Sequence, residues 1–221
     1  MSPKNSYLSK NFSSAKLNGG KVLIDNDDMF LLMRPVGSFQ MNQYFLGCKK
    51  TKAAAFIDSG EDPSVFFAEC AKEMSFNVEH LIQTHAHIDH VAGLNPTKKL
   101  YPDAPIYLHK LDMPVYDSII QYVGMFAMKC ELPLPPVDAH IEEGDSISVG
   151  NIKLDVIFTP GHSPGSCVLV HHHPTDPFAF VGDLIFQNSV GRTDLPLCDP
   201  LAMQDSIKKV VQLLTPNTLL L

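Results

Sequence analysis

Several classes of protein are excluded by what this sequence lacks. It has no run of about 18 or more uncharged apolar residues, so no membrane-spanning helix is predicted. Basic residues are in deficit, since 17 Lys and Arg stand against 24 Asp and Glu, with a formal net charge of −7. A protein that binds nucleic acid needs a basic surplus to neutralise phosphates, so we expect neither nucleic acid nor a membrane as a partner. Because no Gly/Ser/Pro-rich linker or low-complexity tract divides the 221 residues, we predict one domain.

The N-terminal stretch lacks both acidic residues and an apolar core. Residues 1–24 contain four lysines, no arginine and no acidic residue before Asp25. A secretory signal needs an apolar segment, and a mitochondrial presequence usually uses arginine. We therefore predict a flexible extension over residues 1–24, a folded domain over residues 25–221 and a cytoplasmic location, with a mitochondrion or another organelle as the alternative.

Cysteine is sparse, odd in number and never arranged as C-x-x-C. The five cysteines are Cys48, Cys70, Cys130, Cys167 and Cys198. Neither a disulfide framework nor a cysteine zinc knuckle is indicated, and each cysteine is expected to be a small buried hydrophobic residue.

Apolar and alternating runs predict more strands than helices. Strands are expected at residues 30–36, 41–48, 53–58, 81–84, 106–109, 146–149, 152–158, 166–171 and 178–181. Helices are expected after Asp62-Pro63, at residues 94–100, over residues 110–130 and from Asp199-Pro200. The apolar face of the last helix is predicted to comprise Met203, Ile207, Val210, Val211 and Leu214. Strands and helices do not alternate regularly, so an α/β fold of two packed sheets with helices outside is favoured.

One short segment concentrates groups that bind metals. His85, His87, Asp89 and His90 lie within six residues, directly after a predicted strand. In an extended stretch side chains two apart point the same way, so the first three can share one side while a turn brings His90 round. Imidazole nitrogen and carboxylate oxygen are ligands that zinc and iron accept. The triplet at residues 171–173, by contrast, is interpreted as a polar strand end.

Two later positions complete a ligand set. His162 stands in a turn of prolines and glycines, directly after the apolar strand at residues 152–158. Asp183 follows another apolar strand and Gly182, at the edge of a sheet. Either residue alone would be ordinary, whereas together with the first cluster they indicate a metal site.

These motifs resemble the metallo-β-lactamase superfamily from about residue 30 to residue 221, and the segments 143–145, 159–165 and 182–194 are similar to the glyoxalase II-like hydrolases. The resemblance implies a four-layer αββα sandwich of the metallo-β-lactamase type, with the metals between the two sheets at one edge. By motif, His85, His87 and His162 would bind a first metal, Asp89 and His90 a second, and Asp183 would bridge both.

The resemblance also assigns a further histidine to the second metal, in a Pro-Gly-His-Gly segment that this sequence does not contain. Residues 218–221 form an apolar run that is expected to be a strand entering the core, and domains seldom end in this way. We therefore expect the C-terminal part of the domain to be missing and the second metal site to be incomplete.

The resemblance implies a metal-dependent hydrolase of glutathione thioesters such as lactoylglutathione. Zinc is expected at two sites, with iron or manganese as alternatives, and would supply hydroxide from a shared water near neutral pH. Asp89 would also orient that water, as a catalytic residue. Arg192 is expected either to meet a substrate carboxylate or to pair with Asp194.

Two alternatives remain open at this stage. Persulfide dioxygenases share most of the motif but bind a single iron through two histidines and one aspartate, which correspond to His85, His162 and Asp183. The other alternative is a non-catalytic metal-binding remnant, because of the absent histidine. No residue supports a β-lactamase or nuclease function.

Overall fold

The computed structural model describes residues 19–61, 65–126 and 128–221. Its larger sheet runs in chain order, with antiparallel pairing from β1 to β4 and parallel pairing from β4 to β7. Its strands are β1 (Lys21–Asp25), β2 (Met29–Val36), β3 (Met41–Cys48), β4 (Ala53–Ile57), β5 (Asn77–Ile82), β6 (Ile106–His109) and β7 (Ala139–Ile141). Parallel neighbours need crossover connections, and these connections supply the helices on one side of the sheet.

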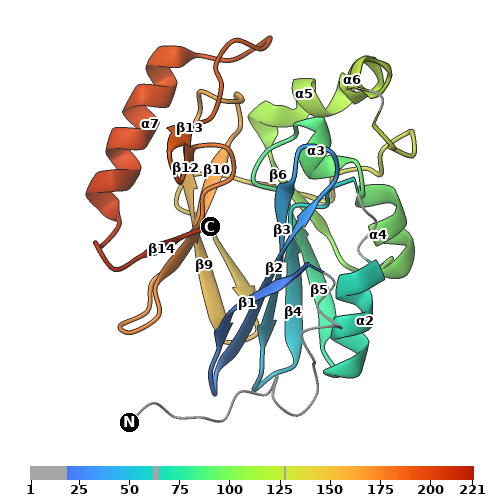
Figure 1. Cartoon of the computed structure of the whole chain (residues 1–221), viewed down its shortest axis with the longest axis vertical. Helices are drawn as coiled ribbons and strands as arrows, with labels where there is room; N and C mark the ends of the chain where they lie inside the picture. The colour runs from blue at the N-terminus through green and yellow to red at the C-terminus, as the bar shows by residue number, and fades with distance from the viewer. Residues whose placement is uncertain (1–18, 62–64, 127) are drawn as a thin grey trace.

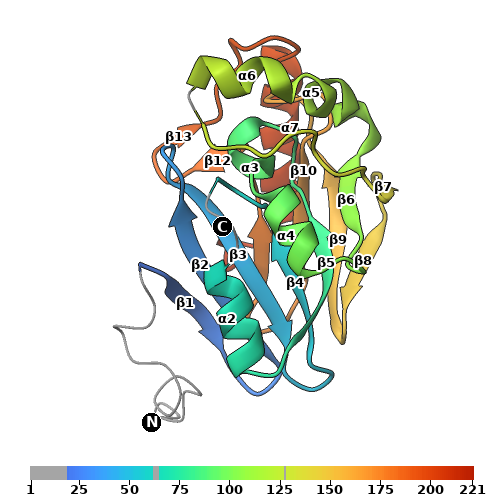
Figure 2. The same cartoon turned by 90° about the vertical axis from the view of Figure 1, so that its right-hand side faces the viewer.

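The crossover helices pack against the outer face of the larger sheet, and those between β6 and β7 lie over one end of the molecule (Figures 1 and 2). They are α2 (Val65–Glu73), α3 (Ile88–Val91), α4 (Leu94–Leu100), the 3₁₀ turn η2 (Lys110–Asp112), α5 (Met113–Asp117) and α6 (Ile119–Phe126). Phe45, Phe56 and Phe67 pack in the core between this sheet and the helices, with ring centroids 5.6 to 6.1 Å apart. Among the described residues, no helix is both long and apolar enough to cross a membrane.

The smaller sheet has the order β14-β11-β10-β9-β8, and α7 covers its outer face (Figure 1). Its elements are β8 (Ser146–Val149), β9 (Ile152–Phe158), β10 (Cys167–His171), β11 (Phe178–Phe180), β14 (Leu219–Leu220) and α7 (Pro200–Leu213), and a separate ribbon pairs β12 (Ile185–Phe186) with β13 (Ser189–Val190). The β8–β9 hairpin turns at Gly150, whose φ of +58° suits the predicted Gly150-Asn151 turn.

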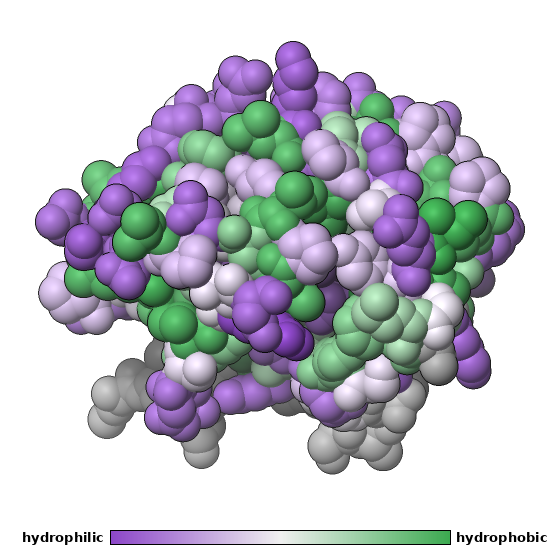
Figure 3. Space-filling model, turned by 90° about the horizontal axis from the view of Figure 1, so that it is seen from above, coloured by the Kyte–Doolittle hydropathy of each residue, from purple (hydrophilic) through white to green (hydrophobic). Residues whose placement is uncertain are grey.

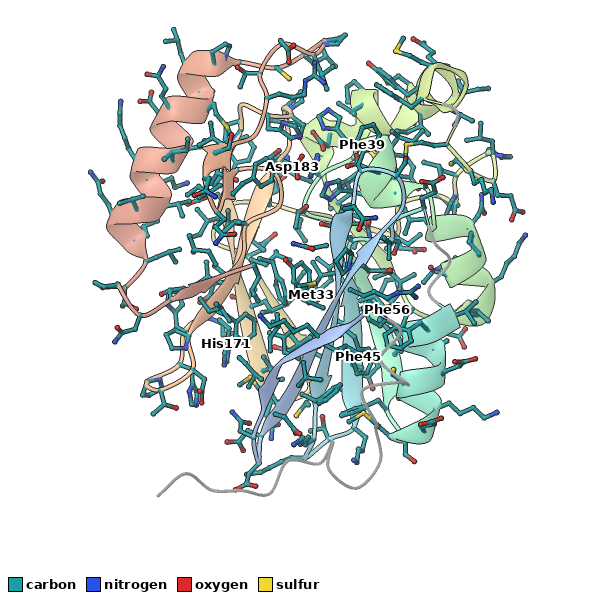
Figure 4. The ribbon with its side chains drawn as sticks, viewed as in Figure 1. Met33, Phe39, Phe45, Phe56, His171 and Asp183 are labelled. Atoms are coloured by element: carbon teal, nitrogen blue, oxygen red, sulfur yellow. The ribbon has the colours of Figure 1, made fainter. Side chains whose placement is uncertain are left out.

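The two sheets face each other across a second core, so the predicted four-layer αββα sandwich is confirmed. Tyr44 on β3 and Phe180 on β11 meet across this interface with ring centroids 4.9 Å apart. A third core joins the smaller sheet to α7 through buried side chains such as Met203 and Val210. In Figure 4, Phe45 and Phe56 lie in the core between the larger sheet and its helices, and Met33 packs against the core between the two sheets.

Several predictions from the sequence need correction. Most of the predicted extension, residues 1–24, lies outside the described residues, but its last four residues belong to β1. The single long helix over residues 110–130 is wrong, because the segment divides into η2, α5 and α6, with a break at Ser118. Proline at position 114 lacks the N–H that a continuous helix would use, and the Ser118 hydroxyl donates to the Val115 carbonyl.

Smaller features also differ from expectation. Val211 is exposed on α7, although Met203 and Val210 are buried as predicted. The proposed cap of α2 falls at residues 62–64, outside the described residues. All five cysteines are free, and three of them are buried: Cys48, Cys70 and Cys167.

The predicted cap of the last helix allows a stability test. The carboxylate of Asp199 accepts the N–H groups of Leu201 and Ala202 at 2.9 and 3.1 Å. Asp199→Ala should lower the free energy of unfolding by about 1 kcal/mol, measured by urea denaturation. Asp205→Ala, which removes an exposed carboxylate from the same helix, should change it by less than about half of that. Equal losses in the two variants would contradict the capping role.

Candidate metal centre

The first histidine cluster lies where β5 ends and α3 begins. His85 and His87 belong to the loop after β5, whereas Asp89 and His90 are in α3. The predicted extended run through Asp89 is therefore wrong, because the helix begins at Ile88 with His87 as its N-terminal cap residue. The helical turn still directs His90 toward His85, with ring centroids 4.0 Å apart.

Two groups of side chains converge at this place. The first comprises His85, His87 and His162, and the second comprises His85, His90 and Asp183. Within each group the candidate ligand atoms lie within 4.8 Å of one another. Histidines far apart in the sequence are thus brought together, since His87 Nδ1 and His162 Nε2 are 2.8 Å apart.

Asp183 belongs to the second group and also faces His162 of the first. Its Oδ1 is 3.3 Å from His90 Nε2, and its Oδ2 is 3.3 Å from His162 Nε2. Gly182 permits this placement, because its φ is +50° and a Cβ atom there would come within 2.7 Å of the Thr84 hydroxyl. One carboxylate therefore offers one oxygen to each group.

Asp89 lies at the margin of the cluster. Its Oδ2 is 3.7 Å from His90 Nε2, and it belongs to neither of the two groups. The triplet at residues 171–173 takes no part. His171 is the last residue of β10, as predicted for a strand end. It is buried, its Nδ1 lies 3.0 Å from the Lys153 carbonyl, and Figure 4 shows it far from Asp183.

The donor atoms of the cluster suit a metal cation. His85 Nε2 is buried and has no hydrogen-bond partner among the described residues, and the buried His90 Nε2 makes no well-oriented hydrogen bond there although Asp183 Oδ1 is 3.3 Å away. Buried polar atoms normally find partners, so unpaired imidazole nitrogens that face a carboxylate indicate a bound ion. Three or more nitrogen and oxygen donors at one point match the preferences of zinc and iron.

The electrostatics of the imidazoles differ within the cluster. Burial, with His90 next in effect, holds the pKa of His85 well below its usual range, and burial lowers the pKa of His87 to about 3. Burial would also lower the pKa of His90, but Asp58, Asp89 and Asp183 raise it well above its usual value. The neutral imidazoles are ready to act as ligands, and the carboxylates favour a positive charge beside His90, as a proton or a metal cation.

Asp58 is a functional residue that the sequence analysis did not identify. It is buried at the end of β4, where its φ is +57°. Its Oδ2 lies 2.8 Å from His90 Nδ1 and accepts the Thr84 hydroxyl at 2.8 Å, while its Oδ1 accepts the Thr84 N–H at 2.7 Å. These bonds fix the ring of His90 so that Nε2 faces the cluster. The position after a buried strand, which Asp58 shares with Asp183, is the signal that could have revealed it.

Asp112 is a second residue that was missed. Its carboxylate, fully buried, accepts the N–H groups of Ala86 and Gly165, each at 2.6 Å, and the Ser163 hydroxyl at 3.0 Å. It thereby ties the loop of His85 and His87 to the loop of His162. Burial raises the pKa of Asp112 even so. The sequence carried no signal for this role, since one aspartate in an expected helix usually faces solvent.

Two pockets adjoin the cluster and share Phe39, Asp89 and Asp183 in their lining. The larger has a volume of about 790 Å³ and reaches Asp89, His90 and Asp183 from the side of β1 to β3 and β14. The smaller has a volume of about 160 Å³ and reaches His87, Asp89, His162 and Asp183 from the side of α5 and α6. From above, over the end of the molecule that carries α5 and α6, the surface shows hydrophobic patches between hydrophilic ones (Figure 3).

A four-layer sandwich with histidines and aspartates at one edge of both sheets is the arrangement of a metallo-hydrolase class of proteins. The family model described as the metallo-beta-lactamase superfamily matches residues 36–220, so the chain belongs to this superfamily. Its members are mostly hydrolytic enzymes, and their fold binds divalent metals.

Individual relatives span most of the chain. The probable metallo-hydrolase YqgX of Bacillus subtilis (strain 168) is 33% identical over 190 residues, covering 85% of this chain and 86% of that protein. Hydroxyacylglutathione hydrolase GloC of Haemophilus influenzae is 28% identical over 180 residues, covering 79% and 80%. The crystal structure of TTHA1623 in a di-iron-bound form gives a TM-score of 0.73 and 32% identity, covering 86% of this chain and 89% of that one.

Another relative corresponds to the alternative function. Human mitochondrial persulfide dioxygenase ETHE1 is 29% identical over 151 residues, which cover 68% of this chain but only 50% of that protein. This chain is therefore about as similar in sequence to the persulfide dioxygenase, at 29% identity, as to the hydroxyacylglutathione hydrolase, at 28%.

The role of Asp112 can be tested by metal affinity. Asp112→Asn keeps the shape of the side chain but replaces one carboxylate oxygen by an amide NH2 group. That group cannot accept the hydrogen bonds that Ala86, Ser163 and Gly165 donate. Metal affinity, measured by competition with a chromophoric chelator, should fall about 10–100-fold. Asp138→Asn is the matched control, because Asp138 also accepts a backbone N–H, from Ile106, yet is remote from the cluster. Wild-type affinity in Asp112→Asn would contradict the role.

Proposed function

We propose that this chain hydrolyses glutathione thioesters with the help of two metal ions, zinc being the expected metal and iron or manganese the alternatives. The observation that carries the proposal is the position of Asp183, whose two oxygens face His162 in one group and His90 in the other, each at 3.3 Å. His85, His87 and His162 would hold the first ion, His90 and Asp89 the second, and Asp183 would contact both. When bound, the metal pair would supply hydroxide from water near neutral pH.

The protein's own groups account for the rest of the reaction. Asp89 lines both pockets and is placed to orient the attacking water. The water oxygen bonds to the acyl carbon, the C–S bond breaks, and sulfur leaves with its electron pair. Of the two protons of the water, one passes to solvent as hydroxide forms, and the other passes from the carboxylic acid product to the thiolate or to solvent. A thiolate needs no protonation to leave, unlike an amide nitrogen, so no further acid is required at the leaving group.

The proposed substrate class, a glutathione thioester, is taken from the hydroxyacylglutathione hydrolase among the relatives. The similarity to hydroxyacylglutathione hydrolase GloC over 79% of this chain supports a glutathione thioester. The larger pocket, at about 790 Å³, is within the size range of small-molecule sites and can take a tripeptide thiol. Lys21, Gln40 and Gln187 line it and offer polar contacts.

Persulfide oxidation is the second candidate, favoured by the human relative and by the proximity of the three residues it would need. His85 and His162 have ring centroids 4.9 Å apart, and Asp183 Oδ2 is 3.3 Å from His162 Nε2. These residues could hold a single iron. His87 and His90 beside them favour two ions instead.

One experiment separates the candidates. Metal content per chain is measured together with hydrolysis of lactoylglutathione and oxygen uptake on glutathione persulfide. We expect thioester hydrolysis that a chelator abolishes and added metal restores. One iron per chain with oxygen uptake would establish the dioxygenase, and bound metal with neither reaction would establish a non-catalytic remnant.

His87 provides a variant test of the first ion. His87→Ala should lose about one metal equivalent per chain and most of the thioester hydrolysis, because three imidazoles become two. The fold should persist, since the loop residue is not part of the cores. His172→Ala, an exposed histidine of the same chain, should change neither quantity. Full metal content and rate in His87→Ala would overturn the ligand assignment.

Asp183 provides a test of the shared carboxylate. Asp183→Asn keeps the shape but removes the charge that two cations would share. Metal titration should show a loss at both sites that exceeds the roughly 10–100-fold cost of losing a hydrogen-bond partner of a ligand. Asp155→Asn, a surface change on β9, should leave both affinities unchanged. Unaltered affinity at either site in Asp183→Asn would exclude a bridging role.

A further inference from the structure

The smaller pocket beside the cluster is mainly apolar, and the proposed function does not explain it. Seven of its lining residues are apolar or aromatic: Phe39, Ile88, Val115, Ile119, Tyr122, Phe126 and Leu195. The opposite wall consists of cluster residues, including His87, His162 and Asp183. An apolar space that opens directly onto the reacting groups of a hydrolase indicates a place for part of the substrate.

The position of Phe39 and of α6 defines this space. Phe39 stands in the turn between β2 and β3 and is 55% exposed, yet its ring meets Phe126 edge-on with centroids 5.7 Å apart. Ile119, Tyr122 and Phe126 follow one another at helical spacing on α6, so they present a single apolar stripe. Figure 4 shows Phe39 and Asp183 near the same end of the molecule.

Arg192, which also lines the smaller pocket, already forms an ion pair with Asp194. Arg192 donates to both oxygens of Asp194, from Nε at 2.6 Å and from Nη2 at 2.8 Å. Of the two roles expected for Arg192, the structure thus shows the ion pair. Its backbone carbonyl also lies 2.8 Å from His162 Nδ1 and so helps to orient that ring. A substrate carboxylate would have to compete with Asp194 for the guanidinium.

Polarity decides which part of a thioester fits. Glutathione carries two carboxylates, an ammonium group and two amides, and each would lose solvation against the apolar wall without gaining a partner. The larger pocket, with Lys21, Gln40 and Asn42 in its lining, suits those groups. Phe39, Asp89 and Asp183 line both pockets. A thioester bond near Asp89 and Asp183 would therefore have its glutathione part in the larger pocket and its acyl part in the smaller one.

On the basis of the proposed thioester hydrolysis, we propose that the smaller pocket binds the acyl group and selects unsubstituted apolar acyl groups of up to about six carbons over lactoyl. The size supports this limit, because the pocket has about 160 Å³, and apolar cavities of about 150 Å³ accommodate benzene. A lactoyl group offers the apolar wall a single methyl group, so it gains less apolar contact there than a butanoyl or hexanoyl chain.

The test is a chain-length series on the unaltered, metal-loaded protein. Acetyl, butanoyl, hexanoyl, decanoyl and lactoyl thioesters of glutathione are compared by kcat/KM. Each added methylene up to hexanoyl should raise kcat/KM about threefold to fourfold, and decanoyl should bring no further gain. Butanoyl should exceed lactoyl by about tenfold. A flat series, or lactoyl as the best substrate, would overturn the acyl pocket while thioester hydrolysis itself stood.

A binding measurement separates this inference from the proposed function. S-hexylglutathione and S-methylglutathione are thioethers that cannot be hydrolysed, and their alkyl groups stand in for the acyl chain. Calorimetry should show the hexyl compound binding at least about tenfold more tightly. That preference without any thioester hydrolysis would retain the apolar pocket and overturn the proposed reaction. Equal affinities would overturn the pocket whatever the reaction.

Tyr122→Ala locates the preference, with Phe186→Ala as its matched control. Tyr122 lines only the smaller pocket and Phe186 lines only the larger one, so both changes remove an aromatic ring near the cluster. Tyr122→Ala should reduce the hexyl-to-methyl ratio about threefold to tenfold, whereas Phe186→Ala should leave the ratio unchanged. If both variants lower the ratio equally, the preference does not arise in the smaller pocket. If Tyr122→Ala does not fold, the series on the unaltered protein still decides the proposal.

Discussion

The loops that carry the histidines are held together by two buried carboxylates, Asp58 and Asp112. A buried carboxylate is costly unless several donors satisfy it, and the donors here come from segments far apart in the sequence. Asp112 takes its donors from Ala86, Ser163 and Gly165, so the loops of the two sheets are linked at one point. Asp58 fixes His90 in the same way from β4. The convergence of the imidazoles depends on these bonds, because no helix or strand contains all of them.

Much of this arrangement could be predicted from the sequence because it follows from strand ends. His85, His162 and Asp183 each come shortly after an apolar strand, and strand ends meet at the edges of a packed pair of sheets. Side-chain chemistry then identified a metal site. Period and turn signals likewise predicted the β8–β9 hairpin and the capped start of α7, both of which depend on neighbouring residues alone.

The features that could not be predicted depend on tertiary contacts. Nothing local distinguishes Asp112 from an exposed aspartate, since its three donors lie about 26 and more than 50 residues away in the chain. The helical conformation of Asp89 replaces the extended run that was predicted from His85 to Asp89, in which the chain turned only at His90. The apolar composition of residues 110–130 likewise suggested one helix, and only Pro114 and the Ser118 hydroxyl show where the chain bends.

That bend connects the fold to the selection of substrate. The segment from α5 to α6 lines the smaller pocket on both sides of the break at Ser118, because α5 contributes Val115 and α6 contributes Ile119, Tyr122 and Phe126. The cluster is fixed by the ends of the two sheets, while this pocket is formed largely by a segment outside them. Substitutions in α6 can therefore change the shape of the smaller pocket with little effect on the imidazoles, because the bonds that orient His90 and His162 come from Asp58 and the Arg192 carbonyl. The imidazole cluster and the smaller pocket thus depend on different parts of the same chain.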